Sequence, residues 1–120
     1  MAETNTHALY YSDDLMINLQ LRYGEGLLSP GGAAELARLL GGVDVADRHG
    51  LDLGCGLGGY DELLVHEHGA GHVTGVDVNA AAIDHARRRA LDAGLADRLT
   101  FHAVDEGPLP FADGAFDFAV

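Results

Sequence analysis

The sequence is poor in several residue types, and each shortage excludes a class of protein. It contains one cysteine, Cys55, so no disulfide bond can form within the chain. Only 7 lysine and arginine residues stand against 19 acidic residues, and the net charge of −12 repels nucleic acid and anionic membranes. No apolar run reaches the roughly 18 residues of a membrane-spanning helix. The N-terminus shows no secretory signal. These absences predict a cytoplasmic protein without nucleic-acid or membrane partners.

The composition that is present predicts one small folded domain. The chain has 120 residues, of which 48% are hydrophobic, so it can bury a core. In residues 13–23, "DDLMINLQLRY", Leu15, Met16, Leu19 and Tyr23 share one helical stripe. Ser29 and Pro30 then begin a second helix, which Gly41–Gly42 ends. We expect its inner face to carry Ala33, Leu36, Ala37 and Leu40.

From residue 43 onward, strand patterns alternate with helix patterns. Strands are expected at 51–53, 72–76, 99–104 and 116–120, and helices at about 60–68 and 80–92. Asn79 is placed to cap the second of these helices, which should bury Ile83, Ala86, Ala90 and Leu91 and stop at Gly94. This alternation predicts an α/β fold, a Rossmann-like, doubly wound parallel sheet of about four strands with N-terminal lid helices.

Two features conflict with a complete, regular sheet. Gly50 lies where the central strand should carry an apolar β-former. The chain also stops inside its fourth strand, which would leave an apolar edge uncovered. We therefore expect residues 1–42 to form a lid and residues 43–120 to form a ligand-binding core truncated after the fourth strand. The sequence is interpreted as the front portion of a longer protein.

The segment "GCGLGG", residues 54–59, satisfies the G-x-G-x-x-G fingerprint and follows the first strand of the core. In open α/β sheets, ligands bind beyond the carboxyl ends of the strands, where glycines allow a ligand to approach the backbone. Asp77 ends the second strand, about 20 residues further on, and can accept hydrogen bonds from two ribose hydroxyls. At this point NAD and S-adenosylmethionine (SAM) are both viable ligands.

The charge of the residues around the glycine loop distinguishes between NAD and SAM. Asp52 precedes the loop, and the following helix opens with Asp61 and Glu62, so a diphosphate would meet competing anions. The same carboxylates tolerate a sulfonium and an ammonium group. Asp105 ends the third strand, where it could accept the exocyclic amine of adenine. The loop and these acids together favour SAM.

Two other chemistries are disfavoured. His66 and His68 flank Glu67, but residues two apart on a helix do not face one another, and no third ligand has zinc spacing. We therefore predict no metal site. Cys55 is interpreted as a small residue tolerated in the loop, not as a nucleophile.

Three motifs in register over residues 48–120 resemble the class I SAM-dependent methyltransferases. They are "LDLGCGLGG" (51–59), "VTGVDVN" (73–79) and "VDEGPLPFADGAFDFAV" (104–120). The resemblance implies that Gly54 and Gly56 line the methionine and ribose parts of SAM, that Asp77 binds the ribose with Val78 against the adenine, and that Asp105 takes the adenine amine. The full predicted cofactor-binding set is Leu28, Ser29, Asp52, Gly54, Cys55, Gly56, Asp77, Val78, Asp105 and Glu106.

The N-terminal segment "YYSDDLMINLQLRYGEGLLSPGG" is similar to the phosphoethanolamine and related phosphobase N-methyltransferases. By position, Tyr11 matches their catalytic tyrosine and Ser29 the SAM-contacting serine. Leu19 departs from the family, which often has an aromatic residue there, and Glu106 replaces a small or apolar residue.

The sequence therefore predicts SAM-dependent methyl transfer to a small-molecule acceptor, with an amine favoured. Two alternatives stay open, namely an NAD-dependent oxidoreductase and a truncated, non-catalytic SAM-binding module.

Overall fold

The computed structural model describes residues 12–28 and 32–120. Two helices, α2 (Asp13–Tyr23) and α3 (Gly32–Leu40), come first. The elements that follow are β1 (His49–Leu53), α4 (Gly59–His66), β2 (His72–Asp77), α5 (Ala80–Asp92), β3 (Leu99–Ala103) and β4 (Phe118–Ala119). The helices and strands expected from the sequence are therefore all present within the described ranges, with small shifts at their ends.

The four strands form one parallel sheet in the order β3-β2-β1-β4. This confirms the predicted α/β, Rossmann-like architecture. The register pairs His49 with His72 and Leu53 with Val76, so β1 and β2 end side by side. Beside them, β3 ends one residue earlier than predicted, at Ala103. The carboxyl ends of three strands thus meet at one edge of the sheet.

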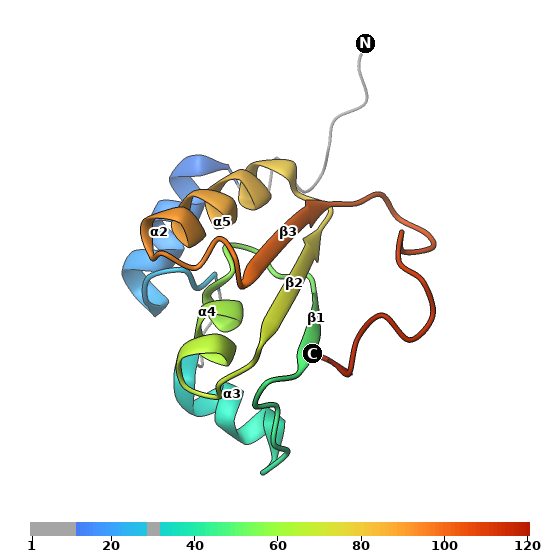
Figure 1. Ribbon diagram of the computed structural model, residues 1–120. Coiled ribbons are helices and arrows are strands. Elements are labelled where there is room, and N and C mark those ends of the chain that lie inside the picture. The colour runs from blue at the N-terminus through green and yellow to red at the C-terminus, as the bar shows by residue number, and fades with distance from the viewer. Residues whose placement is uncertain (1–11, 29–31) are drawn as a thin grey trace.

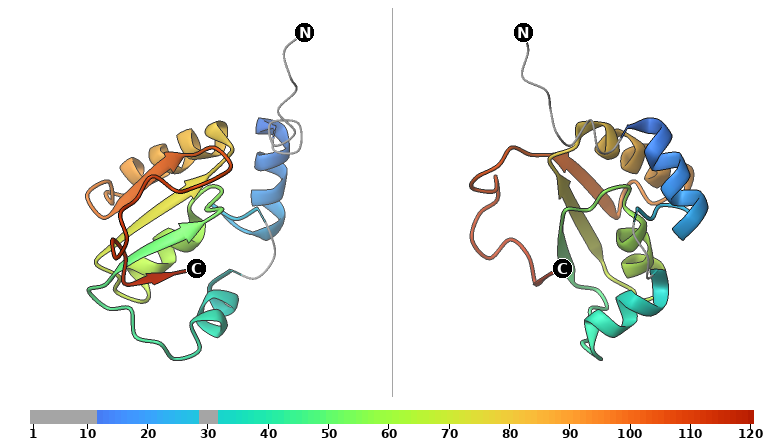
Figure 2. Two further views of the ribbon diagram at one scale, coloured as in Figure 1. Left: turned by 90° about the vertical axis from the view of Figure 1, so that its right-hand side faces the viewer. Right: turned by 180° about the vertical axis from the view of Figure 1, so that it is seen from behind.

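Helices α3, α4 and α5 cover one face of the sheet, and the long loop between β3 and β4 passes on the other side (Figure 1). Helix α2 lies next to α5, and the arrowheads of β1 and β2 point toward it (Figure 2, left). Helix α2 therefore stands at the edge where the strands end. Among the described residues, no helix has the length and apolarity needed to cross a membrane.

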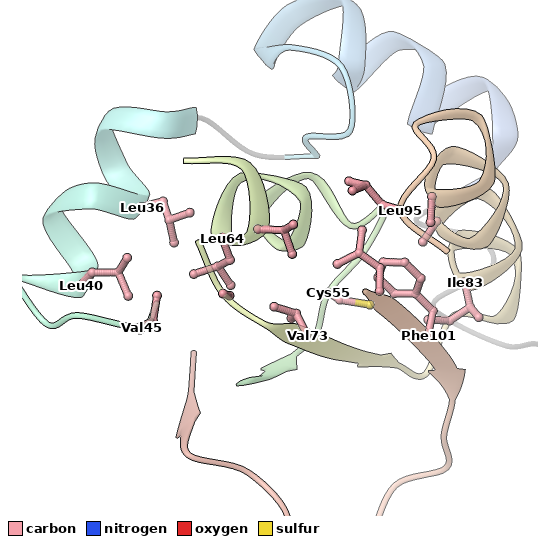
Figure 3. Packing of buried hydrophobic residues seen from close by; sticks show 14 residues of the cluster. Leu36, Leu40, Val45, Cys55, Leu64, Val73, Ile83, Leu95 and Phe101 are labelled. Atoms are coloured by element: carbon pink, nitrogen blue, oxygen red, sulfur yellow. The ribbon is translucent and has the colours of Figure 1, made fainter. Parts of the chain in front are cut away.

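The main core lies between the helices and the sheet. Leu36 from α3, Leu64 from α4, Ile83 from α5 and Phe101 from β3 meet there (Figure 3). A second, smaller cluster joins Met16 of α2 to other apolar residues, namely Leu57, Ala82 and Leu28. Helix α2 is therefore packed on its own small cluster and does not enter the main core.

Several predicted core positions are wrong. Ala33 and Ala37 are exposed, because α3 is buried only along Leu36 and Leu40, where it packs toward α4. Leu91 is 67% exposed. The chain reverses at Gly94, whose φ of +72° is left-handed, and Leu95 turns back to occupy the core.

Other predicted positions are only partly buried. Leu15 is exposed, whereas Leu19 and Tyr23 are half-buried. The stripe predicted for the first helix therefore buries only Met16. In contrast, the Asn79 side chain accepts a hydrogen bond from the Ala82 N–H at 3.1 Å, which confirms the predicted cap of α5.

Gly50 fits the central strand because of a residue far along the chain. It pairs with Phe118 of β4, and a Cβ atom at Gly50 would collide with the Phe118 ring. The glycine thus leaves space that the aromatic ring fills. Strand β4 is shorter than predicted, although hydrogen bonds between Val120 and β1 continue the pairing to the last residue.

Candidate functional site

A cavity of about 550 Å³ lies at the carboxyl ends of β1, β2 and β3. This volume is within the range of small-molecule sites in proteins. The cavity is lined by the loop after β1, by Asp77 and Val78 after β2, by Asp105 and Glu106 after β3, and by Leu28 before α3. All predicted cofactor-binding residues except Ser29 line it. Ser29 and the predicted catalytic residue, Tyr11, lie outside the described residues.

The glycine loop is bent by three left-handed residues. Gly54, Gly56 and Gly58 have φ angles of +75°, +55° and +78°, which side chains rarely tolerate. The loop is fastened to the neighbouring strand, because the N–H groups of Gly54 and Cys55 both donate to the Val76 carbonyl, at 2.8 and 3.0 Å. The fingerprint thus produces a turn that closes one wall of the cavity.

Asp77 holds two segments of this wall together. Its Oδ2 accepts from the Gly56 N–H and its Oδ1 from the Asn79 N–H, both at 2.9 Å. Each carboxylate oxygen retains a second lone pair for a further donor. Asp77 is therefore fixed by the backbone of the glycine loop and of the turn before α5. It can still accept hydrogen bonds from the hydroxyl groups of a ligand in the cavity.

Asp52 and Asp61 lie beneath the loop. Asp52 lines the cavity although only 7% of it is exposed, and burial is the main cause that raises its pKa. Asp61 has no exposed surface, and burial followed by the neighbouring Asp52 raises its pKa well above the usual range. The sequence placed Asp61 and Glu62 around the ligand, but neither lines the cavity.

Glu62 is instead engaged by a cation. Its Oε1 accepts from Arg89 of α5 at 2.9 Å, and Arg89 also reaches Glu25 at 3.2 Å. The argument against a diphosphate ligand therefore depends on other acidic residues, namely those that line the cavity. Asp52, Asp77, Asp105 and Glu106 all line the cavity and would oppose a phosphate group.

The Cys55 side chain is buried, and burial with three neighbouring carboxylates raises the pKa of its thiol far above the usual range. A thiol in this setting is not a nucleophile. Over the described ranges, no group of three or more His, Cys, Asp and Glu residues could hold a metal ion.

The segment after α2 also lines the cavity, next to the glycine loop. Gly26 accepts a hydrogen bond from the Gly59 N–H at 3.1 Å, and its own N–H donates to Gln20 at 3.0 Å. A Cβ atom at Gly59 would collide with the Gly26 carbonyl oxygen. The glycine at the start of α4 therefore permits direct contact between the segment after α2 and the glycine loop.

Sequence reasoning missed several residues that line the cavity, among them Gly26, Tyr60, Ala82 and Leu109. Tyr60 directly follows the glycine loop and opens α4, so its position next to the fingerprint could have pointed to it. Gly26 and Leu109 come from segments without periodicity, and their approach depends on how those loops fold.

Comparison with known proteins gives consistent results. The profile of the family described as "Methyltransferase domain" matches residues 51–120. Methyltransferase GfsG of Streptomyces halstedii is 33% identical over 98% of this chain and 39% of that protein. Phosphoethanolamine N-methyltransferase 1 of Triticum aestivum is 28% identical over 89% of this chain and 21% of that protein.

Among solved structures, phosphoethanolamine N-methyltransferase 2 of Haemonchus contortus, in complex with phosphomonomethylethanolamine and S-adenosylhomocysteine, superposes with a TM-score of 0.82. It is 27% identical, and the match covers 92% of this chain and 26% of that one. This chain therefore spans well under half the length of the relatives it matches.

Proposed function

Because this chain belongs to the methyltransferase domain family, we propose that it is the cofactor-binding part of an enzyme that transfers a methyl group from SAM to a small-molecule amine. The observation that carries the proposal is the cavity at the strand ends, where a backbone-fastened Asp77 faces a glycine loop between further carboxylates. That arrangement suits a cationic adenosyl ligand.

SAM is the cofactor of this family, and the predicted cofactor agrees with neighbours solved with S-adenosylhomocysteine and with SAM. The residues present fit it. Gly54 adds no side chain to the wall, since no atom lies within 4 Å of where its Cβ would be, so a ligand can approach the backbone. Asp77 is the proposed ribose acceptor, with Val78 against the adenine and Asp105 on its amine.

Asp52 is the proposed partner of the positively charged methionine end of the cofactor. Gly54, Cys55 and Gly56 would surround that end through their backbone, since the Cys55 side chain is buried. Leu28 and Ser29 would contact the cofactor from the lid segment, and Glu106 would lie beside Asp105 at the adenine.

The amine acceptor is supported by resemblance and by charge. Relatives that resemble this chain over both the lid and the core include phosphoethanolamine N-methyltransferases. Other relatives are named for sterols or for geranyl diphosphate. A cavity lined by four carboxylates attracts a cationic amine and opposes a diphosphate.

When bound, SAM supplies a methyl group that is already activated on a sulfonium. The protein then has to orient the acceptor and exclude water, and alignment of reactants can supply roughly 7–11 kcal/mol at the upper end. In the proposed mechanism, residues 1–42 act as the lid over the residue 43–120 core. Tyr11, outside the described residues, accepts the proton that the amine must lose and passes it to a histidine or to water.

The test is isothermal titration of the full chain with SAM, S-adenosylhomocysteine and NAD. We expect saturable binding of the two adenosyl ligands, no binding of NAD, and loss of binding in Asp77→Ala. Asp84→Ala removes an exposed carboxylate from α5 without touching the cavity and is the matched control. NAD binding tighter than SAM would support the oxidoreductase alternative instead.

A screen of amine, sterol and phenol acceptors then separates an enzyme from a binding module. Methylation of an amine would support the proposed acceptor. A chain that binds SAM but methylates none of these classes would favour the non-catalytic module. The cytoplasmic location stays a prediction from the sequence, which fractionation of cells would test.

A further inference from the structure

Asp61 is a buried carboxyl that receives no hydrogen bond from any donor in the described part of the chain. It extends from the first turn of α4, has no exposed surface, and neither of its oxygens contacts a donor among the described residues. The start of a helix favours a nearby negative charge only modestly. Burial of an ionised carboxylate away from water is far more unfavourable. The cost of burial therefore exceeds the benefit of the helix, and the neutral acid is favoured.

The sheet register places Asp61 next to Asp52. Asp52 pairs with Gly75, so its side chain and the missing side chain of Gly75 point to the same face of the sheet. A Cβ atom at Gly75 would lie 2.6 Å from Oδ2 of Asp61. The Asp61 carboxyl thus occupies the space above Gly75, directly beside Asp52. A glycine in the middle of a buried strand is otherwise unfavourable, and here it makes room for this carboxyl.

The groups around the pair do not compensate two negative charges. Asp77 faces Asp52 from the end of β2, Glu62 acts on Asp61 from α4, Tyr60 faces Asp52 from the same helix, and the Cys55 thiol lies beside both. Arg89 contacts Glu62, but it is bound by Glu25 as well, so its charge is already shared between two other carboxylates. Two adjacent buried carboxyls in such surroundings share one proton.

We propose that Asp61 is a positioning residue that retains its proton in the folded protein and donates it in a hydrogen bond to Asp52. The pair then carries a single negative charge, which lies on Asp52 and faces the cavity. The O–H bond of Asp61 stays intact, so no proton leaves the site. The proposal rests on the proposed function only in assigning that charge to the ammonium group of SAM.

This arrangement explains how Asp52 stays ionised in a place that is almost fully buried. A hydrogen bond to the charged form of a carboxyl favours that form, and the Asp61 contact lowers the pKa of Asp52 against the effect of burial. The same bond fixes the rotamer of Asp52, because one of its oxygens must face Asp61. Without Asp61, the carboxylate would lose both its donor and its fixed orientation.

The direct test is infrared spectroscopy of the full chain, prepared with isotope-labelled aspartate, at neutral pH. We expect a band of a protonated aspartate carboxyl in the wild type, which shifts in heavy water and is lost in Asp61→Asn. Asp84→Asn, on the exposed side of α5, should leave the band in place. A folded wild-type protein without this band would overturn the proposal. The measurement needs no cofactor, so it does not depend on the proposed function.

Cofactor affinity provides the second readout. Asp61→Asn retains a donor toward Asp52 and should bind SAM within about twofold of the wild type, whereas Asp61→Ala should bind about tenfold more weakly, since a hydrogen bond to a charged group is lost. Equal affinity in the alanine variant would contradict the positioning role. If the infrared band is present but the wild type binds no SAM, the shared proton stands and the proposed function fails.

Stability against pH gives the third readout. The folded-state pKa of Asp61 is raised above its unfolded value, so its contribution is complete below the unfolded pKa and is lost as pH rises toward the folded pKa. The melting temperature of the wild type should therefore fall relative to that of Asp61→Asn over this window. A constant difference between the two proteins across that window would contradict a shared proton.

Discussion

Helices α2 and α5 lie next to each other but are held in different ways. Helix α5 buries four residues in the core, Ala82, Ile83, Ala86 and Ala90, whereas α2 buries only Met16. The contacts that α2 and Glu25, just after its end, make with α5 include the polar Asp13–His85 contact at 3.2 Å and the Arg89–Glu25 contact. Exposed pairs of this kind contribute about 0–1 kcal/mol each. We therefore expect α2, as part of the proposed lid, to separate from the core without unfolding of the sheet.

Two truncations test this difference most directly, and they carry the largest expected effect. Leu64→Ala removes a fully buried side chain from the main core and should lower the free energy of unfolding of the whole sheet by about 2–5 kcal/mol. Met16→Ala should leave the sheet almost unchanged and increase hydrogen exchange in α2 only. Chemical denaturation and hydrogen exchange measure the two effects. An equal loss of stability in both variants would show that lid and core unfold together.

The contact between lid and core can be broken at one glycine. In Gly59→Ala, the added Cβ would meet the Gly26 carbonyl, and overpacking of this kind costs about 1–3 kcal/mol. We expect about tenfold weaker SAM binding, measured by titration. Gly94→Ala is the control, because its left-handed φ is strained but no atom lies near the new Cβ, so it should affect stability and not affinity.

The smallest expected effect is on the rate of methyl transfer alone. Tyr11→Phe removes the proposed proton acceptor and should reduce turnover about tenfold or more, equivalent to about 1.4 kcal/mol or above, with little change in SAM affinity. Steady-state kinetics of the full chain with an amine acceptor measure it. A turnover number equal to that of the wild type would remove Tyr11 from the mechanism and leave the lid a purely structural role.

The sequence was most informative where the signal is local. Asn79 lies directly before a helix, Asp77 ends a strand, and the glycines mark a turn, so their positions followed from neighbouring residues. Contacts between distant segments could not be predicted in this way. Helical periodicity located Leu91 on the inner side, but the left-handed turn at Gly94 gave that place to Leu95.

The misplacement of Asp61 has the same physical origin. An acidic residue at the start of a helix is usually solvated, and nothing near it in the sequence shows that Gly75, 14 residues later, leaves a space for its carboxyl. The prediction from the sequence therefore grouped Asp52, which lines the cavity, with Asp61, which lies behind the cavity wall. Only the sheet register distinguishes the two.

The contact between Phe118 and Gly50 joins segments that are synthesised at different times, because the Phe118 ring fills the space next to Gly50. The His49 N–H is bound by Asp117, 68 residues later, whereas its register partner on β2 is His72. Until residues 117 and 118 have been synthesised, one edge of the central strand has no partner, and Gly50 has no Phe118 ring against it. Such an edge can pair with other chains, so we expect β1 to be most open to intermolecular pairing in the interval before residues 117–120 have been made.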